Sequence, residues 1–166
     1  MTANSASRIM YCKSIEQIIE QSIETDFRIF EALFNLVYKI FDNVDKSTLT
    51  IEYFDLFSSI LEMLCIHDEL MPKLGLNWSI LTNSIIDLYK NHECTETSMN
   101  SKSDQVAQGL LRIISKLINY ETINTIVNLV PFIFQQSLFP EHGRNKLKNS
   151  KSRQDAYQLI YDICKY

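Results

Sequence analysis

Four cysteines and three histidines are the residues of this chain that could take part in covalent catalysis. They are Cys12, Cys65, Cys94 and Cys164, with His67, His92 and His142. A cysteine protease needs a thiolate, a histidine that holds its proton and a third group that orients the histidine. Cys65 lies in an apolar helical run, where a thiol is inert packing, and His67 points to a different side of the same helix. Cys94 has no glycine-rich or helix-opening context, so the spacing predicts no catalytic residue.

Cysteine and histidine are also the side chains that zinc prefers, and they occur in pairs at 65–67 and 92–94. The spacing of these pairs fits no familiar zinc motif, and side chains two residues apart diverge on a helix. Glu16, Glu20 and Glu24 stand four residues apart, as on a solvated helix face. No glycine-rich phosphate-binding run is present. We therefore expect no metal and no cofactor.

The elements that would hold these residues are helices. Hydrophobic residues make up 46% of the 166 residues and charged residues 22%, which is ordinary for a globular protein long enough to bury a core. Only three glycines and three prolines are present, whereas a sheet protein needs turn residues about every 8–12 positions. The chain is therefore predicted to be a single all-helical domain spanning residues 1–166.

Apolar residues recur at helical spacing in seven segments. The expected helices cover residues 7–22, 26–41, 50–67, 78–91, 104–119, 123–138 and 153–166. Asp26 is expected to cap the second helix, and Pro131 to kink the sixth helix or divide it in two. Ser152 is expected to cap the last helix, with Asp155 completing a capping box. Residues 92–103 are predicted to form the main internal loop.

Several of these helices, above all the second and the sixth, are apolar over more than one stripe. Such a helix needs neighbours on two sides, which stacked helix pairs provide. We therefore expect an irregular armadillo- or HEAT-like helical-repeat stack, with a closed helical bundle as the alternative. The apolar stripe of the last helix continues almost to Tyr166 without a cap, which indicates a fragment of a longer protein.

Charge is distributed unevenly along the chain. The formal net charge of −4 combines +5 in residues 142–153 with −9 in the remainder. The positive charges belong to a basic loop, residues 139–152, and to the start of the helix after it. They are Arg144, Lys146, Lys148, Lys151 and Arg153. This loop is a candidate partner-binding surface for an acidic protein or nucleic acid, or else a solvated linker, and the negative body argues against nucleic acid.

The sequence also bears on the cellular compartment. No run of about 18 apolar residues is present, so no membrane-spanning helix is expected. Residues 1–7 are small and polar, unlike a signal peptide, and the widely spaced cysteines are typical of reduced thiols. We expect an intracellular protein, cytoplasmic or nuclear.

One segment, residues 138–160, resembles a known family. It contains Leu-Phe-Pro at 138–140, a lysine-containing loop, and Ser-Arg-x-x-Ala-Tyr-x-Leu-Ile at 152–160. The large ubiquitin-specific proteases have a similar Leu-Phe-Pro-like helix end, a basic loop and a Ser-Arg-x-x-Ala-Tyr/Phe-x-Leu-Leu helix shortly before their catalytic domain. The matching residues of that helix are Ser152, Arg153, Ala156, Tyr157, Leu159 and Ile160. In this interpretation Ala156 allows close helix approach, and Tyr157 with Ile160 provides the packing face.

The resemblance implies a noncatalytic helical region of a ubiquitin carboxyl-terminal hydrolase. The family's cysteine box, similar to Gly-Leu-x-Asn-x-Gly-Asn-Thr-Cys, and its Gly-His-Tyr-like histidine box are absent from this sequence, so no catalytic residue carries over. The chain would then be a scaffold or protein-interaction segment whose thiol-protease domain lies outside it. Its expected partners are ubiquitin-pathway proteins or the parent's own catalytic domain. The alternatives are a free-standing helical adaptor and, from a different class, an unrecognised helical enzyme.

Overall fold

The structure is a computed structural model that describes residues 2–92, 102–134 and 150–166. Every regular element within these ranges is a helix, as the sequence predicts. The elements are α1 (Thr2–Thr25), α2 (Phe27–Asn43), the 3-10 helix η1 (Lys46–Thr48), α3 (Ile51–Ile66), α4 (Leu70–Lys73), α5 (Trp78–Asn91), α6 (Lys102–Lys116), α7 (Ile123–Val127), α8 (Val130–Ile133) and α9 (Ser150–Lys165). None of the described helices combines the length and the apolar character needed to cross a membrane.

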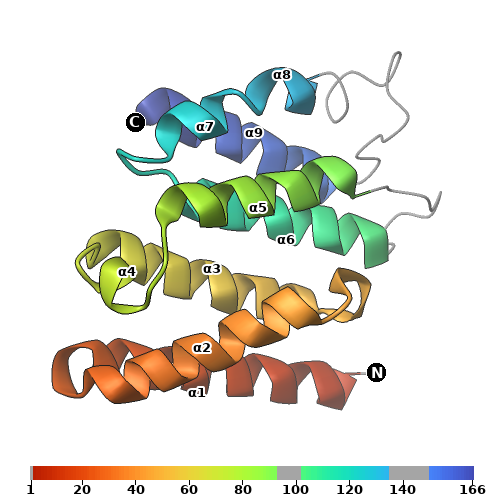
Figure 1. Ribbon diagram of the computed structural model, residues 1–166. Coiled ribbons are helices and arrows are strands. Elements are labelled where there is room, and N and C mark those ends of the chain that lie inside the picture. The colour runs from red at the N-terminus through yellow and green to blue at the C-terminus, as the bar shows by residue number, and fades with distance from the viewer. Residues whose placement is uncertain (1, 93–101, 135–149) are drawn as a thin grey trace.

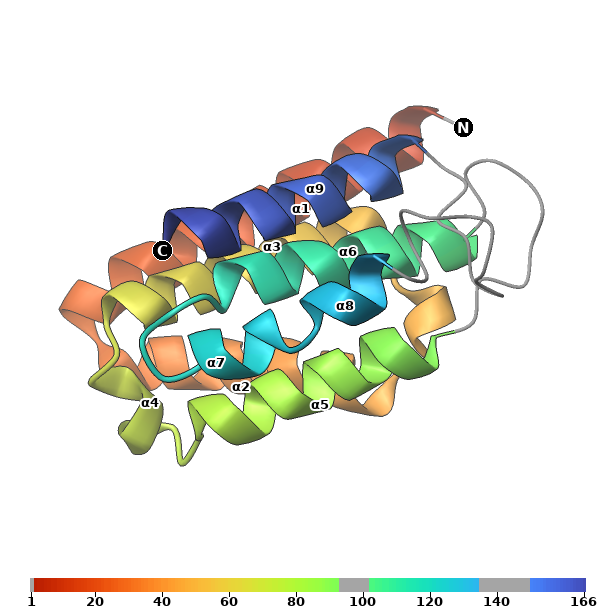
Figure 2. The same ribbon diagram turned by 90° about the horizontal axis from the view of Figure 1, so that it is seen from above.

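The long helices are stacked in two layers (Figures 1 and 2). One layer contains α1, α3, α6 and α9, and each of these helices packs on the next in that order. The second layer contains α2, α5 and the α7–α8 pair, in which α2 packs on α1, and α5 packs on α6 and α7. Within this stack α3 packs between α1 and α6, and α2 contacts both α1 and α3, so these helices need apolar side chains on more than one side. Assignment of this stack to the armadillo or HEAT class stays a prediction.

Local side-chain hydrogen bonds set two of the helix starts. Asp26 caps α2, as predicted, and its Oδ1 accepts a hydrogen bond from the Arg28 amide at 3.0 Å. Asn77 caps α5 by accepting from the amides of Ser79 (2.9 Å) and Ile80 (3.2 Å). These caps satisfy amides that have no partner in the first turn of a helix. Because Asp26 is the one residue between α1 and α2, these two helices form a tight hairpin.

Pro131 divides the predicted sixth helix in two. α7 ends at Val127, and α8 begins at Val130 with Pro131 in its first turn. Proline lacks an amide hydrogen, and its ring would clash with the carbonyl four residues earlier, which here belongs to Val127. Proline is tolerated in the first turn of a helix, so one helix ends and a second begins just before it. The predicted continuation to residue 138 lies mostly outside the described residues.

The last helix begins earlier than predicted. α9 starts at Ser150, so Ser152 is its third residue, and the prediction that Ser152 caps the helix is wrong. The Ser152 side chain is fully buried, because packing against the core decides its orientation. Asp155 pairs with Arg112 of α6 instead of closing a capping box. Residues 102–103 and 150–152, which were expected to belong to loops, are helical.

The core is built around α3. Phe34 and Phe41 of α2 and Phe54 and Phe57 of α3 are at most 4% exposed, and the ring centroids of Phe41 and Phe57 are 4.6 Å apart. Gly109 of α6 lies so close to α3 that a Cβ at this position would be 2.2 Å from Phe54 Cγ. The missing side chain lets α6 pack closely along α3. This close packing also brings together the polar side chains that α3 and α6 carry outside the core.

Candidate interaction groove between α3, α6 and α9

A groove of about 520 Å³ runs along the first layer between α3, α6 and α9. Most of the residues that line it have polar side chains; they are Asp55, Ser58 and Ser59 of α3, Leu111, Arg112, Ser115 and Lys116 of α6, and Asp155, Gln158 and Asp162 of α9. On α3, Ser58 and Ser59 stand three and four positions after Asp55, and on α9 the lining residues stand three, four or seven positions apart, so each set lies on one side of its helix. The groove therefore joins three helices that are distant in sequence.

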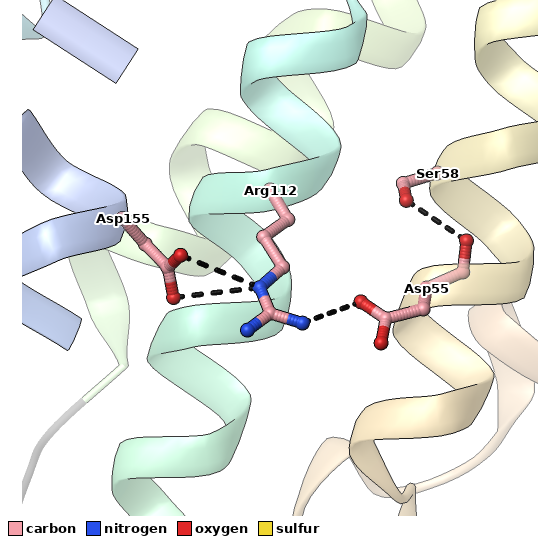
Figure 3. A network of polar contacts seen from close by, with 4 residues as sticks. All are labelled: Asp55, Ser58, Arg112 and Asp155. Carbon is pink, nitrogen blue, oxygen red and sulfur yellow. Dashed lines mark hydrogen bonds and ion pairs between the residues drawn. The ribbon is translucent and has the colours of Figure 1, made fainter. Parts of the chain in front are cut away.

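Arg112 connects the three helices (Figure 3). Its Nη1 donates a hydrogen bond to Asp55 Oδ1 at 2.7 Å, and its Nε lies 3.4 Å from each carboxylate oxygen of Asp155. Burial opposes the charge of the guanidinium, but the two carboxylates outweigh this effect and the pKa of Arg112 is raised above its usual value. The side chains of Arg112, Asp55 and Asp155 are 34%, 49% and 20% exposed, so water screens the network in part.

Three further polar contacts flank this network. The hydroxyl of Ser115 donates to Asp162, and Asp162 Oδ1 also accepts a hydrogen bond from Gln158 Nε2 at 2.7 Å. Lys116 pairs with Glu62 of α3 at 2.8 Å. The lining thus carries three carboxylates against two cations, and Glu62 adds a fourth carboxylate beside it. The excess of negative charge favours a partner that presents lysine or arginine side chains.

Replacing Arg112 with methionine tests whether this network stabilises the fold. The substitution keeps the apolar part of the side chain but removes the cation that Asp55 and Asp155 share, so we expect the free energy of unfolding to fall by about 1–2 kcal/mol. Urea denaturation at low and high salt measures the change, which should be smaller at high salt. The matched control, Arg28→Met, removes an exposed ion pair with Asp26 and should change nothing measurable. Equal effects of the two substitutions would contradict a stabilising role for the network.

The thiol of Cys65 is held in its neutral form. It donates a hydrogen bond to the carbonyl of Lys116 at 3.3 Å and accepts one from the side-chain amide of Asn119 at 3.7 Å. Burial raises the pKa of Cys65 to about 11, so little thiolate exists near neutral pH. His67 is paired with Glu69 at 3.7 Å. The hydrogen bonds, the burial and the raised pKa of Cys65 are those of a structural thiol and not of an activated nucleophile.

The thiol of Cys12 lies on α1 and is not activated either. Burial and, after it, the carboxylates of Glu52 and Asp55 raise the pKa of this thiol.

Of the cysteine and histidine pair at residues 92–94, His92 is described, whereas Cys94 lies outside the described residues. Across the part of the chain that the structure describes, no three histidine, cysteine, aspartate or glutamate side chains are grouped so that they could hold a metal ion.

Comparison with curated proteins gives a match to the ubiquitin carboxyl-terminal hydrolase puf of Drosophila melanogaster, with 25% identity over 140 residues. The match covers 80% of this chain, and the chain spans about 3% of the length of that relative. No protein-family model matches the sequence, and no solved structure matches it. The chain is similar to a small segment of a ubiquitin carboxyl-terminal hydrolase.

The similarity to this hydrolase covers the centre of the chain. A match over 80% of the chain must include the central helices α3, α5 and α6. Within the final helix, Ser152, Ala156 and Leu159 are fully buried and form its packing face, with Ile160 half-buried beside them. Tyr157 is 57% exposed, so the prediction that it belongs to this face is wrong. Each residue turns the helix by about 100°, which carries Tyr157 away from the side that Ala156 occupies.

The predicted basic surface lies mostly outside the described residues. Arg144, Lys146 and Lys148 fall there, Lys151 is in the first turn of α9, and Arg153 is exposed on the same helix. That these five residues form a partner-binding surface therefore stays a prediction.

The groove has only a weak signature in the sequence. Asp55 and Glu62 stand seven residues apart on α3, and Asp155 and Asp162 stand seven apart on α9, so each pair marks one side of its helix. Arg112 is a charged residue within the apolar run of α6. Such stripes are ordinary on solvated helices, and only the packing order of α3, α6 and α9 brings them to one groove.

Proposed function

We propose that this chain is a noncatalytic interaction segment of a ubiquitin-specific protease, whose stacked helices hold a partner beside a thiol-protease domain encoded elsewhere in the same protein. The observation that carries this proposal is the 25% identity to a ubiquitin carboxyl-terminal hydrolase, which extends over 80% of this chain and 3% of that protein. Because the matching segment is about 3% of that protein, most of its length is available for other domains.

The chemistry of the described residues supports a noncatalytic role. A nucleophilic cysteine needs a lowered pKa, whereas burial raises the pKa values of Cys12 and Cys65. The groove between α3, α6 and α9 offers a surface for a partner instead. Its excess of carboxylates fits a protein segment with basic side chains, which belongs either to another protein or to the parent's own catalytic domain.

The coding sequence on either side of these 166 residues tests the family part of the proposal. We expect the same reading frame to encode the cysteine box and the histidine box of a ubiquitin-specific protease. A complete reading frame that contains neither box contradicts the proposal.

A ubiquitin propargylamide probe, which reacts with catalytic cysteines of these proteases, tests the noncatalytic part. The full-length protein should be labelled, and the 166-residue chain alone should not. Labelling of the isolated chain at any of its cysteines overturns the proposal that it is noncatalytic.

The role of the groove is tested in the full-length protein with the triple variant Asp55→Asn, Asp155→Asn and Asp162→Asn. Hydrolysis of ubiquitin–aminomethylcoumarin, which needs no other protein, should be unchanged if the groove binds a separate protein and slower if it binds the parent's own catalytic domain. Removal of ubiquitin from polyubiquitinated cellular proteins should be slower. The charge-matched control carries three exposed carboxylates replaced elsewhere, Glu20→Gln, Asp42→Asn and Asp87→Asn. Equal activity of the triple variant and the control on both substrates would rule out the groove as the partner surface.

A further inference from the structure

A pocket of about 360 Å³ lies at the end of the stack where α4, the start of α5 and the turn between α6 and α7 come together (Figures 1 and 2). Met71 and Trp78, which are 2% and 5% exposed, and the half-buried Leu76 give it an apolar interior. Exposed residues around this interior form a rim with three carboxylates, those of Asp68, Glu69 and Glu121. We call this site the Trp78 pocket. It shares no lining residue with the groove between α3, α6 and α9.

The backbone on both sides of the Trp78 pocket is fixed by hydrogen bonds. In the turn that carries Glu121, Asn119 Oδ1 accepts from the Glu121 amide at 2.9 Å, and Asn119 Nδ2 donates to Cys65 Sγ of α3 at 3.7 Å. On the other side, the amide of Leu76 donates to the carbonyl of Met71 at 3.1 Å and closes the turn after α4. The pocket is therefore formed before a partner arrives, which lowers the entropy cost of binding.

The carboxylates of the rim have few cations to balance them. Asp68 and Glu121 form no ion pair with any described residue. Glu69 Oε1 lies 3.7 Å from Nδ1 of His67, which balances its charge only when the histidine is protonated. The rim is therefore negative and favours a cationic group.

The positive groups beside the Trp78 pocket are directed elsewhere. The ammonium of Lys73 lies over the ring of Phe27, 5.6 Å from its centroid. The ammonium of Lys116 pairs with Glu62 at 2.8 Å. The start of α5 would attract an anion, but the side chain of Asn77 already accepts hydrogen bonds from the first amides of this helix. The negative charge of the rim is therefore available to a partner.

Trp78 supplies a hydrogen-bond donor inside the pocket. Its side chain is almost fully buried, yet its indole N–H makes no hydrogen bond with any described residue. A buried donor without a partner destabilises a fold unless it reaches water, and the ring borders solvent at the pocket that it lines. The site thus combines one unused donor with several acceptors, which suits a ligand that carries both kinds of group.

We propose that the Trp78 pocket binds an arginine side chain presented by a partner protein. The methylene groups of the arginine pack on Met71 and Leu76 in the apolar interior. Its planar guanidinium has five N–H donors, enough to reach Asp68 from one segment of the rim and Glu121 from another. The peptide carbonyl of the same arginine is an acceptor that matches the indole N–H. Protein sites for small molecules span about 300–1,000 Å³, so a pocket at the lower end of this range suits one long side chain.

Two other cations fit this pocket less well. A lysine has a similar apolar stem, but its three donors belong to a single nitrogen, so it bridges separated carboxylates less well. A metal ion needs ligands that converge on one point, and no three carboxylate, histidine or cysteine side chains of the described residues are grouped in that way. Arginine binding here does not depend on the proposed function, because the residues of the pocket are not those of the groove.

Fluorescence of the 166-residue chain tests the proposal, because Trp78 is its single tryptophan. Titration with the peptide acetyl-Gly-Gly-Arg-Gly-Gly-amide should change this fluorescence, and the change should saturate. A matched citrulline peptide, which keeps the shape of arginine but lacks its charge, should bind at least ~10-fold more weakly. A matched lysine peptide should bind at least ~3-fold more weakly.

Two double variants show whether the rim is responsible. Asp68→Asn with Glu121→Gln should weaken binding of the arginine peptide by ~10-fold or more. The matched control, Asp55→Asn with Asp162→Asn, removes the same number of charges from the groove and should bind the peptide as the wild type does. Circular dichroism confirms that each variant is folded before the titration.

An arginine peptide that produces no saturable change in fluorescence overturns the proposal. Equal binding of the citrulline peptide, or equal weakening by the two double variants, overturns it as well. Equal affinity for the lysine peptide would show a site for any long cation in place of an arginine site.

Discussion

The substitution Gly109→Ala is expected to lower the free energy of unfolding by about 3 kcal/mol or more. A Cβ at this position would lie 2.2 Å from Cγ, 2.5 Å from Cδ2 and 2.6 Å from Cβ of Phe54. These atoms are at the base of the phenylalanine side chain, so a rotation of the ring cannot remove the overlap. α3 and α6 must move apart instead, and the groove that they line changes with them.

Urea denaturation followed by circular dichroism measures this loss, with Gly75→Ala as the matched control. Gly75 follows α4 with φ at 66°, and the space around its missing Cβ is open. The control therefore reports only the strain of an alanine in the left-handed region, about 1–2 kcal/mol. If Gly109→Ala is no more destabilising than Gly75→Ala, that result contradicts the close packing of α6 on α3 at Gly109.

A double-mutant cycle assigns the loss to Phe54. The substitution Phe54→Ala alone removes a buried ring and should destabilise the protein by about 3–5 kcal/mol. In that background Cγ and Cδ2 of residue 54 are gone and only its Cβ, at 2.6 Å, still overlaps, so Gly109→Ala should add a smaller loss than it does in the wild type. We therefore expect a coupling free energy of about 1–2 kcal/mol between the two positions.

The sequence predicts the helices well where the deciding interactions are local. The apolar stripes and the scarcity of glycine and proline lead to an all-helical fold, and Asp26 and Pro131 act within one helical turn of their own positions. Helix ends are less predictable. α1 extends beyond its expected range at both ends, and α9 begins two residues before Ser152, since no residue of the sequence marks these helix ends sharply.

The groove could not be predicted, because its central contacts join residues far apart in the chain. Arg112 is 57 residues from Asp55 and 43 residues from Asp155. No local pattern distinguishes these charges from those of a solvated helix face. The error at Tyr157 has the same origin, since the side of α9 that is buried depends on where α6 and α7 lie.

Alkylation of Cys65 by iodoacetamide at pH 8 is expected to be ~100-fold slower than that of an ordinary thiol. Only the thiolate reacts, and burial raises the pKa of Cys65 from 9.0 to about 11, which reduces the thiolate fraction by that factor. Peptide mapping by mass spectrometry measures the rate. Between pH 8 and pH 10 the rate should increase by about tenfold per pH unit without levelling off, because the thiol is far from half-ionised.

Cys164 is the internal control for this measurement, because its side chain is exposed on α9 and reports the reactivity of an accessible cysteine in the same sample. In urea the two cysteines should react at similar rates, since unfolding removes the burial of Cys65. Similar rates in the folded protein would instead show that Cys65 is accessible as a thiolate.

The raised pKa of Cys65 also makes the stability of the fold depend on pH, because the folded state disfavours the thiolate. The stability that neutral Cys65 contributes is fully present below about pH 9 and is lost as the pH rises towards 11. The variant Cys65→Ala should therefore lose less stability than the wild type over that pH range.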